Sequence, residues 1–219
     1  MKTYIYGTND LARSLYFHIN KWNEIDIKGF IVSPEYVSHV QEFCGLPITT
    51  LEEIKTSLLP AADIGVYICV GYRDMNKGRQ HVYEICKKSG CSILNFIFPS
   101  AYVDASQMGE GNIIMSQVVI GENTIIGNCN IFRNSSLLEH DSTIEDFNYF
   151  SSHTCIAGKV KVGSRCFFGL NSTVKDGVRI GDGALIGSNA YVSKDLDSEK
   201  VIVPERSMIL EKKLSTDFL

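Results

Sequence analysis

From Met108 to Val192, an apolar residue recurs at every sixth position without interruption. These residues are Met108, Ile114, Ile120, Ile126, Phe132, Leu138, Ile144, Phe150, Ile156, Val162, Phe168, Val174, Ile180, Ile186 and Val192. A period of six matches neither the 3.6-residue repeat of a helix nor the alternation of an exposed strand. It is typical of a hexapeptide β-helix, in which three short strands form one triangular coil. The sequence therefore predicts five stacked coils around an apolar interior.

Two further features of the repeat support this prediction. The residue after the apolar one is often glycine, which suits a corner where a Cβ would crowd the turn. These glycines are Gly109, Gly121, Gly127, Gly163, Gly169, Gly181 and Gly187. Because three repeats of six make one coil, residues 18 apart should lie on the same face, about 4.8 Å from each other. The repeat therefore predicts which side chains lie in register along the prism.

Residues 1–97 follow a different pattern, in which short apolar strands alternate with amphipathic helices. Strands are expected at Thr3–Tyr6, Ile27–Val32, Ile64–Val70 and Ser92–Phe96, and helices at Asp10–Lys21, Leu51–Ser57 and Asn76–Ser89. This alternation predicts βαβ units and a small parallel sheet. Such sheets bind ligands beyond the carboxyl ends of their strands, here near Gly7–Asp10 and Gly71–Asp74.

The first of these turns lacks the glycine pattern of dinucleotide-binding folds. Gly7 is followed by Thr8, Asn9 and Asp10, so only the first glycine of G-x-G-x-x-G is present. The second strand runs into Ser33 without the acidic residue that contacts a ribose. The pattern therefore argues against NAD or FAD. A single diphosphate at the helix N-terminus, and a purely structural cap for the β-helix, both stay open.

The composition indicates the cellular compartment and excludes some classes of binding partner. A net charge of −4, without a cluster of lysine or arginine, argues against a nucleic-acid surface. The first residues run directly into a strand pattern, so no signal peptide is expected, and no apolar run approaches the length of a membrane span. The seven cysteines show no metal-binding spacing and are expected to be reduced. We expect a cytoplasmic protein without a nucleic-acid partner, a membrane partner or a metal.

The corner glycine is missing from four consecutive repeats, where Arg133, Glu139, Glu145 and Ser151 take its position. Local departures from a structural rule tend to cluster at functional sites. This interruption contains His140, which makes the turn around that residue the first candidate for a functional site.

His140 comes two positions after the inward-facing Leu138 and should project outward. The equivalent position is Gly158 one coil later and Glu122 one coil earlier. An imidazole can act as a general base, a carboxylate can fix its tautomer, and a glycine N–H can bind a developing oxyanion. The spacing predicts that these three groups lie in register. The alternative is a surface histidine in a turn.

Three other hypotheses fit the repeat less well: a functional His153, a zinc site and a nucleophilic Cys155. His153 lies 13 residues after His140, so the coil period places the two histidines on different faces. Two such histidines do not supply the three that the shared zinc sites of γ-class carbonic anhydrases need. Cys155 has no base in register that would make it an acyl nucleophile.

Both halves of the chain resemble the bacterial sugar acyltransferases of the PglD and NeuD type. The matching segments are Val70–Asn76 with Arg79, Phe98–Ala101, Glu139–Ile144, Ser151–His153, Ile156–Val160, Phe168–Val174 and Ile186–Ala190. In the second half, the order and the spacing of these segments are specific to the family. The resemblance implies a Rossmann-like domain joined to a left-handed β-helix.

The resemblance also implies a chemistry and an assembly. Members are typically homotrimers, with acetyl-CoA in the groove between neighbouring β-helices and a nucleotide-linked amino sugar (UDP, GDP or dTDP) held largely by the N-terminal domain. His140 matches the family's base, Asp141 its acidic partner and Gly158 the oxyanion amide. Asp141 and Glu122 thus compete for the orienting role, and we favour Asp141.

The resemblance further assigns binding residues. Coenzyme contacts are expected from Ala157, Gly158, Gly169, Asn171, Gly187 and Ser188. Contacts with the nucleotide sugar are expected from Gly7, Thr8, Asn9, Ser33, Gly71, Tyr72, Arg73, Asn76, Tyr149 and His153. The chain departs from the family pattern where Tyr149 replaces a second histidine, Phe98 replaces the histidine of His-Pro-Ser-Ala, and Val203–Arg206 replaces Gly-x-Pro-Ala. These departures affect the choice of acceptor and the adenine contacts.

The predicted organisation has three parts. Residues 1–98 form a nucleotide-sugar-binding domain, residues 99–197 form the β-helix acyltransferase domain, and residues 198–219 form a tail. The expected reaction is direct acetyl transfer to the amino group of a nucleotide-linked deoxysugar, for cell-surface glycan biosynthesis such as O-antigen, capsule or glycoprotein. O-acetylation of a sugar such as a sialic acid, and a non-catalytic role beside a sugar-biosynthetic enzyme, are the alternatives.

Overall fold

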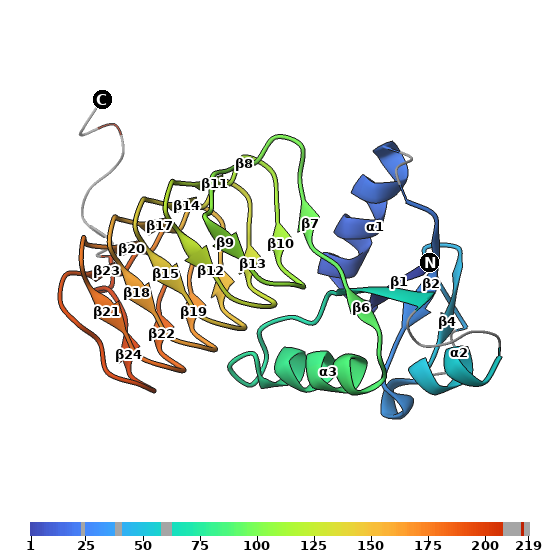
Figure 1. Cartoon of the computed structure of the whole chain (residues 1–219). Coiled ribbons are helices and arrows are strands. Elements are labelled where there is room, and N and C mark those ends of the chain that lie inside the picture. The colour runs from blue at the N-terminus through green and yellow to red at the C-terminus, as the bar shows by residue number, and fades with distance from the viewer. Residues whose placement is uncertain (23–24, 38–40, 58–62, 208–215, 217–219) are drawn as a thin grey trace.

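A computed structural model describes residues 1–22, 25–37, 41–57, 63–207 and 216. An α/β domain lies at one end of the molecule, and a triangular prism of stacked coils extends from it (Figure 1). The chain thus has the predicted fold class, a Rossmann-like domain followed by a left-handed parallel β-helix. Half of the predicted tail, residues 208–215 and 217–219, lies outside the described residues.

The α/β domain is built on a six-stranded sheet with the order β3-β4-β2-β1-β5-β6. Its elements are β1 (Lys2–Tyr6), α1 (Asp10–Trp22), β2 (Ile27–Ile31), a 3₁₀ turn (Pro34–Tyr36), β3 (Glu42–Phe43), β4 (Leu46–Thr49), α2 (Leu51–Ser57), β5 (Ile64–Ile68), α3 (Lys77–Lys88) and β6 (Ser92–Ile93). Only the β3–β4 pair is antiparallel among the described strands. The strand β5 is buried along its whole length, as expected for an apolar run in a parallel sheet covered on both faces.

The prism has three faces, each a stack of two-residue strands. Face 1 contains β7 (Phe96–Ile97), β10 (Ile113–Ile114), β13 (Ile131–Phe132), β16 (Tyr149–Phe150), β19 (Phe167–Phe168), β22 (Leu185–Ile186) and β24 (Val201–Ile202). Face 2 contains β8 (Tyr102–Val103), β11 (Val119–Ile120), β14 (Leu137–Leu138), β17 (Cys155–Ile156), β20 (Thr173–Val174) and β23 (Tyr191–Val192). Face 3 contains β9 (Gln107–Met108), β12 (Ile125–Ile126), β15 (Thr143–Ile144), β18 (Lys161–Val162) and β21 (Arg179–Ile180).

The turns between these strands form the edges of the prism. Edge 1–2 holds the turns that follow face-1 strands, edge 2–3 those that follow face-2 strands, and edge 3–1 those that follow face-3 strands. Leu138 pairs with Ile156, and Ile156 pairs with Val174, so successive coils are 18 residues apart. The predicted register is therefore confirmed.

The expected strand Ser92–Phe96 is not one element. Its first two residues form β6 in the flat sheet, whereas Phe96 begins β7, which pairs with β10 on face 1. The chain leaves one sheet and enters the other within three residues, a change that apolar periodicity alone does not mark. Pairing on face 1 thus begins before residue 99 and continues to β24, beyond residue 197.

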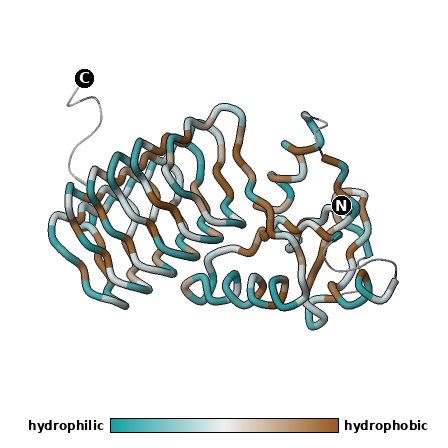
Figure 2. The backbone as a smooth tube through the Cα atoms, in the orientation of Figure 1, coloured by the Kyte–Doolittle hydropathy of each residue, from teal (hydrophilic) through white to brown (hydrophobic). Residues whose placement is uncertain are grey.

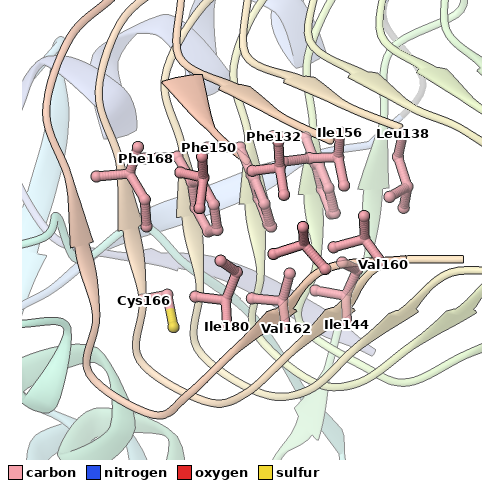
Figure 3. Packing of buried hydrophobic residues seen from close by; sticks show 14 of the residues in the cluster. Phe132, Leu138, Ile144, Phe150, Ile156, Val160, Val162, Cys166, Phe168 and Ile180 are labelled. Carbon is pink, nitrogen blue, oxygen red and sulfur yellow. The ribbon is translucent and has the colours of Figure 1, made fainter. Parts of the chain in front are cut away.

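The interior of the prism is filled by the second residue of each strand. Phe132, Phe150 and Phe168 stack along face 1, with successive ring centroids 4.6 Å apart (Figure 3). Opposite them, Ile144 and Val162 come from face 3 (Figure 3). Because every coil contributes to the same positions, the apolar repeat forms one continuous core.

The structure gives a different reason for the corner glycines from the predicted crowding of a Cβ against the turn. A left-handed backbone recurs three positions after the apolar residue, as at Asp141 (φ 57°) and Lys159 (φ 60°), and not at the corner glycines themselves. At Gly121, a Cβ would lie 3.0 Å from the main-chain nitrogen of His140 in the next coil. The crowding therefore comes from the neighbouring coil rather than from the turn.

The α/β domain is joined to face 1 by an apolar contact and by one buried cation. Ile113 and Ile131 project from face 1 into a cluster that includes Ile5 and Leu11. Hydrophilic residues lie along much of α3, and hydrophobic residues lie along the sheet strands (Figure 2). Arg79 on α3 is nevertheless completely buried, at 0% exposure.

The Arg79 guanidinium connects the two domains. It donates hydrogen bonds to the main-chain carbonyls of Val70, Gly71, Cys129, Phe147 and Asn148 and to Oδ1 of Asn76. Burial lowers its pKa to about 10, so the group stays protonated at neutral pH. A planar fork of five N–H donors suits such a cluster of acceptors, and Nη2 shares its two N–H groups among Asn76, Phe147 and Asn148.

Candidate active site

His140 lies on edge 2–3, in the turn between β14 and β15, with 43% of its side chain exposed. Its Nδ1 is 2.8 Å from Oδ2 of Asp141. Because a carboxylate can only accept, Nδ1 carries the hydrogen of the neutral ring, which leaves Nε2 as the nitrogen that takes up a proton. The projection of His140 away from the core is as predicted.

Asp141 is placed for this bond by its backbone. Its left-handed conformation brings the carboxylate back toward the preceding residue, and its main-chain N–H donates to the carbonyl of Glu122 over 3.0 Å. Asn123, one coil earlier, donates to the other carboxylate oxygen over 3.4 Å. Of the two orienting residues that the sequence left in competition, Asp141 makes the hydrogen bond to the imidazole.

The local charges favour a protonated imidazole. The hydrogen bond with Asp141 raises the pKa of His140, and the charges of Asp141, Glu122 and Glu139 add to this rise against partial desolvation. The same hydrogen bond lowers the pKa of Asp141. A base at this position therefore needs a pH above its raised pKa to be in its neutral form.

Gly158 lies one coil after His140, as the spacing predicted. A Cβ at Gly158 would be 2.8 Å from both Cε1 and Nε2 of the imidazole, so the ring lies directly against this glycine. The Gly158 N–H is not free, however. It donates to Oδ1 of Asp176, a further coil along, over 3.1 Å. The imidazole and the Gly158 N–H, which is the expected oxyanion donor, are thus adjacent, and this N–H already has an acceptor.

A cavity of about 1000 Å³ lies elsewhere, between the α/β domain and face 1. Eight of the ten residues expected to contact a nucleotide sugar line it, and the structure brings them together from β1, β2, the turn before α3 and β16. They are Gly7, Thr8, Asn9, Ser33, Gly71, Tyr72, Arg73 and Tyr149. Their contact with a ligand stays a prediction.

The floor of this cavity is held by the turn between β1 and α1. At Gly7 the backbone has φ +120°, and a Cβ would lie 2.7 Å from the carbonyl oxygen of Cys69, so glycine is required. Asn9 caps α1 by accepting from the N–H of Ala12 and donates to that same carbonyl of Cys69. The N-terminal end of α1 therefore lines the cavity through Asn9, Asp10 and Leu11, with the N–H of Ala12 capped by Asn9 and the carboxylate of Asp10 in the first turn.

Two predicted substrate residues do not line the cavity. Asn76 is completely buried, and its amide donates to the carbonyl of Cys166 and accepts from Arg79. In the structure Asn76 joins the two domains instead of lining the cavity, and its expected contact with the substrate stays a prediction. His153 is exposed on edge 1–2, outside the cavity.

The cavity wall also includes residues that were not among the expected contacts with the nucleotide sugar. Arg133, Glu35, Tyr36 and His81 line it together with Tyr149. Arg133 begins the run of missing corner glycines, so the interruption of the repeat was a usable signal for it. The other three lie on a short turn and a helix, where no periodicity marks them.

The expected coenzyme residues fall on two edges. Ala157 and Gly158 lie on edge 2–3 beside His140, whereas Gly169, Asn171, Gly187 and Ser188 follow face-1 strands and lie on edge 1–2. Face 2 separates the two edges within one chain. A single ligand that touches both sets has to cross face 2 or lie between two copies of the prism.

The structure gives no support to a cysteine nucleophile, to a metal site or to a membrane span in the part of the chain that it describes. Burial raises the pKa of Cys155, which disfavours the thiolate that a nucleophile needs. The described residues contain no group of three or more His, Cys, Asp or Glu side chains suited to a metal ion. Within the same residues, no helix combines the length and the apolarity that a membrane span requires.

Comparison with known proteins adds a family model and several structures. Residues 159–194 match the model of the hexapeptide repeat of succinyl-transferase. PerB of Caulobacter crescentus, solved with CoA and GDP-perosamine, aligns with a TM-score of 0.78 and 22% identity over 92% of this chain and 93% of its own.

Two further structures align over similar lengths. The acetyltransferase domain of PglB from Neisseria gonorrhoeae gives a TM-score of 0.79 at 17% identity, over 91% of this chain and 95% of its own. WeeI from Acinetobacter baumannii gives 0.81 at 18%, over 93% of this chain and 97% of its own. These matches extend through both domains and establish the shared fold.

Proposed function

We propose that this chain is an acetyl-CoA-dependent N-acetyltransferase that acts on the amino group of a nucleotide-linked deoxysugar. The observation that carries the proposal is the His140–Asp141 pair, with its ring against Gly158, on an open edge of a β-helix. The cavity between the domains and the fold shared with sugar N-acetyltransferases support the same assignment.

The proposed chemistry is direct transfer. His140 Nε2 removes a proton as the sugar amine attacks the thioester carbonyl, and Asp141 stabilises the imidazolium. The Gly158 N–H binds the oxyanion of the tetrahedral intermediate, a contribution of about 3 kcal/mol for such a donor. The C–S bond then breaks, and the thiolate of CoA leaves with a proton returned by His140. No covalent bond to the enzyme forms, consistent with the unfavourable environment of Cys155.

The nucleotide sugar is proposed to bind in the cavity between the domains. The cations of Arg73 and Arg133 in the cavity wall suit a diphosphate. Tyr72 and Tyr149 contact each other edge to face at 5.0 Å and offer flat apolar surface to a base or a sugar ring. We further propose a cytoplasmic role in cell-surface glycan biosynthesis.

We also propose a homotrimer, because the two halves of the site are apart in one chain. The cavity lies on face 1, whereas His140 lies on edge 2–3, the edge opposite that face. A neighbouring copy that packs against this edge supplies what one chain lacks. The same packing allows edge 1–2 of one copy and edge 2–3 of another to border one coenzyme.

The first experiment screens UDP-, GDP- and dTDP-linked amino sugars with acetyl-CoA, using thiol release and mass spectrometry of the product. We expect a mass gain of one acetyl group on an amine. His140→Ala and His140→Asn should lower kcat by roughly 10²–10⁴-fold at unchanged thermal stability. An undiminished rate in both variants would remove His140 as the base. Acetylation of a hydroxyl would favour a sugar O-acetyltransferase. No thiol release with any acceptor would favour a non-catalytic role beside a sugar-biosynthetic enzyme.

A mixing experiment tests the shared site. His140→Ala lacks the base, and Arg133→Glu is designed to repel the diphosphate from the cavity. If base and cavity come from different copies, random reassembly of the two variants restores about one quarter of the sites. Each variant refolded alone is the control. A reassembled mixture without activity would place base and cavity in the same copy.

A further inference from the structure

The prism contains a repeated bond in which a main-chain N–H donates to a side chain one coil later. On edge 3–1, Asn128 donates to Asp146 over 2.6 Å and Ser164 donates to Asp182 over 2.8 Å. Both acceptors occupy the second position after an inward apolar residue, 18 residues beyond their donors. At these positions the bond ties adjacent coils together.

On edge 2–3 the same bond is made at the proposed reaction centre. Asp176 occupies the second position after Val174 and accepts from the Gly158 N–H over 3.1 Å. The imidazole of His140 lies against that glycine from the coil before. Gly158 is therefore placed between a candidate base and a carboxylate that holds its N–H.

This arrangement conflicts with transfer unless the carboxylate moves. The oxyanion of the intermediate and the carboxylate of Asp176 would both have to accept from the one N–H of Gly158. Two negatively charged oxygens that close to each other repel. We infer that Asp176 is a displaceable acceptor, which holds the Gly158 amide until the thioester oxygen of acetyl-CoA takes its place. This inference rests on the proposed function, because it needs acetyl-CoA at edge 2–3.

The surroundings of Asp176 suit such a movement. Its side chain is exposed, and in the described part of the chain its carboxylate has the Gly158 N–H as its one hydrogen-bond partner. Asp146, by contrast, also accepts from the side chain of Asn128 over 3.0 Å. Release of the Gly158 bond therefore costs less than release of the equivalent bond at Asp146.

The displaced carboxylate has a consequence for the two forms of the coenzyme. Acetyl-CoA carries a carbonyl oxygen that can replace Asp176, whereas CoA carries a thiol at that place and cannot accept from Gly158 in the same way. After transfer, Asp176 recovers the amide. Asp176 is thus a positioning residue that weakens acetyl-CoA binding and leaves CoA binding untouched by this competition.

The experiment compares the dissociation constants of acetyl-CoA and CoA by calorimetry on the full-length assembly. Removal of one negative charge tightens both ligands through their phosphates, so the informative quantity is the ratio of Kd for CoA to Kd for acetyl-CoA. We expect Asp176→Ala to raise this ratio about threefold to tenfold, the range expected for one hydrogen bond to a carboxylate. Asp176→Asn keeps an acceptor without the charge and should raise it less.

Asp182→Ala is the matched control, because it removes the equivalent bond from Ser164 on edge 3–1, away from His140. It should leave the ratio at the wild-type value. An unchanged ratio in Asp176→Ala, with a wild-type protein that binds acetyl-CoA and transfers acetyl, overturns the inference alone. A wild-type protein that binds neither ligand overturns the proposed function and the inference with it.

Discussion

The contact between His140 and Gly158 makes Gly158→Ala the sharpest test of the proposed base. The added Cβ would lie 2.8 Å from Cε1 and Nε2, whereas ordinary contacts begin at 3.4 Å, so the ring has to retreat by 3.4 − 2.8 = 0.6 Å or more. Gly158 does not have a positive φ, so alanine fits its backbone. The clash is with the end of a side chain, and we expect a loss of stability below about 1.5 kcal/mol.

Catalysis should suffer far more than stability. A displacement on this scale misplaces Nε2 relative to the attacking amine, and we expect kcat to fall about 100-fold while the Gly158 N–H is retained. Thiol release with acetyl-CoA and the best acceptor measures the rate, and thermal unfolding measures the stability. In a His140→Ala background, the same substitution should have little further effect. A wild-type rate in Gly158→Ala would refute the placement of the base against this glycine, and so would an additive double variant.

Three further predictions follow from other contacts. Asp141→Asn keeps an acceptor for the imidazole but removes the carboxylate charge that raises the pKa of His140, so the acidic limb of the kcat/KM profile should move to lower pH while the maximal rate falls about tenfold; an unmoved limb would mean that another group titrates. Arg79→Met leaves buried carbonyls without donors and should cost more than about 3 kcal/mol in denaturant unfolding, with Arg79→Lys rescuing it only in part. Phe150→Ala opens the stacked core and should cost about 3–5 kcal/mol by the same measurement, and a smaller loss would indicate that the coils close over the gap.

The sequence predicted the prism well because its physics is local and repetitive. Each apolar residue has the same environment as the one 18 residues away, so a single period determines face, register and core. The position of His140 beside Gly158 followed from that arithmetic alone. The two turns of the cavity at residues 7–10 and 71–73 were also predictable, since they follow the carboxyl ends of strands in a parallel sheet.

The remaining features depend on contacts between segments that no period relates. Arg79 and Asn76 lie in a motif with the polar character of a ligand-binding turn, yet both are buried between the domains. The acceptor on the Gly158 amide was equally hidden, because Asp176 looks like a surface residue until its coil is stacked on the one before. The identity of a side chain shows what kind of partner it can bind, and tertiary packing determines which partner lies within hydrogen-bonding distance.

The positions of the cavity and of His140 on opposite sides of the prism have a consequence for how such proteins diverge. Under the proposed function, substitutions around the cavity should change which sugar fits without touching the turn that holds the imidazole, because face 1 and edge 2–3 share no residues. Selection for a new acceptor and selection for transfer rate therefore act on separate sets of positions. A scaffold arranged in this way can exchange its acceptor through a few substitutions around the cavity while its acyl chemistry is inherited unaltered.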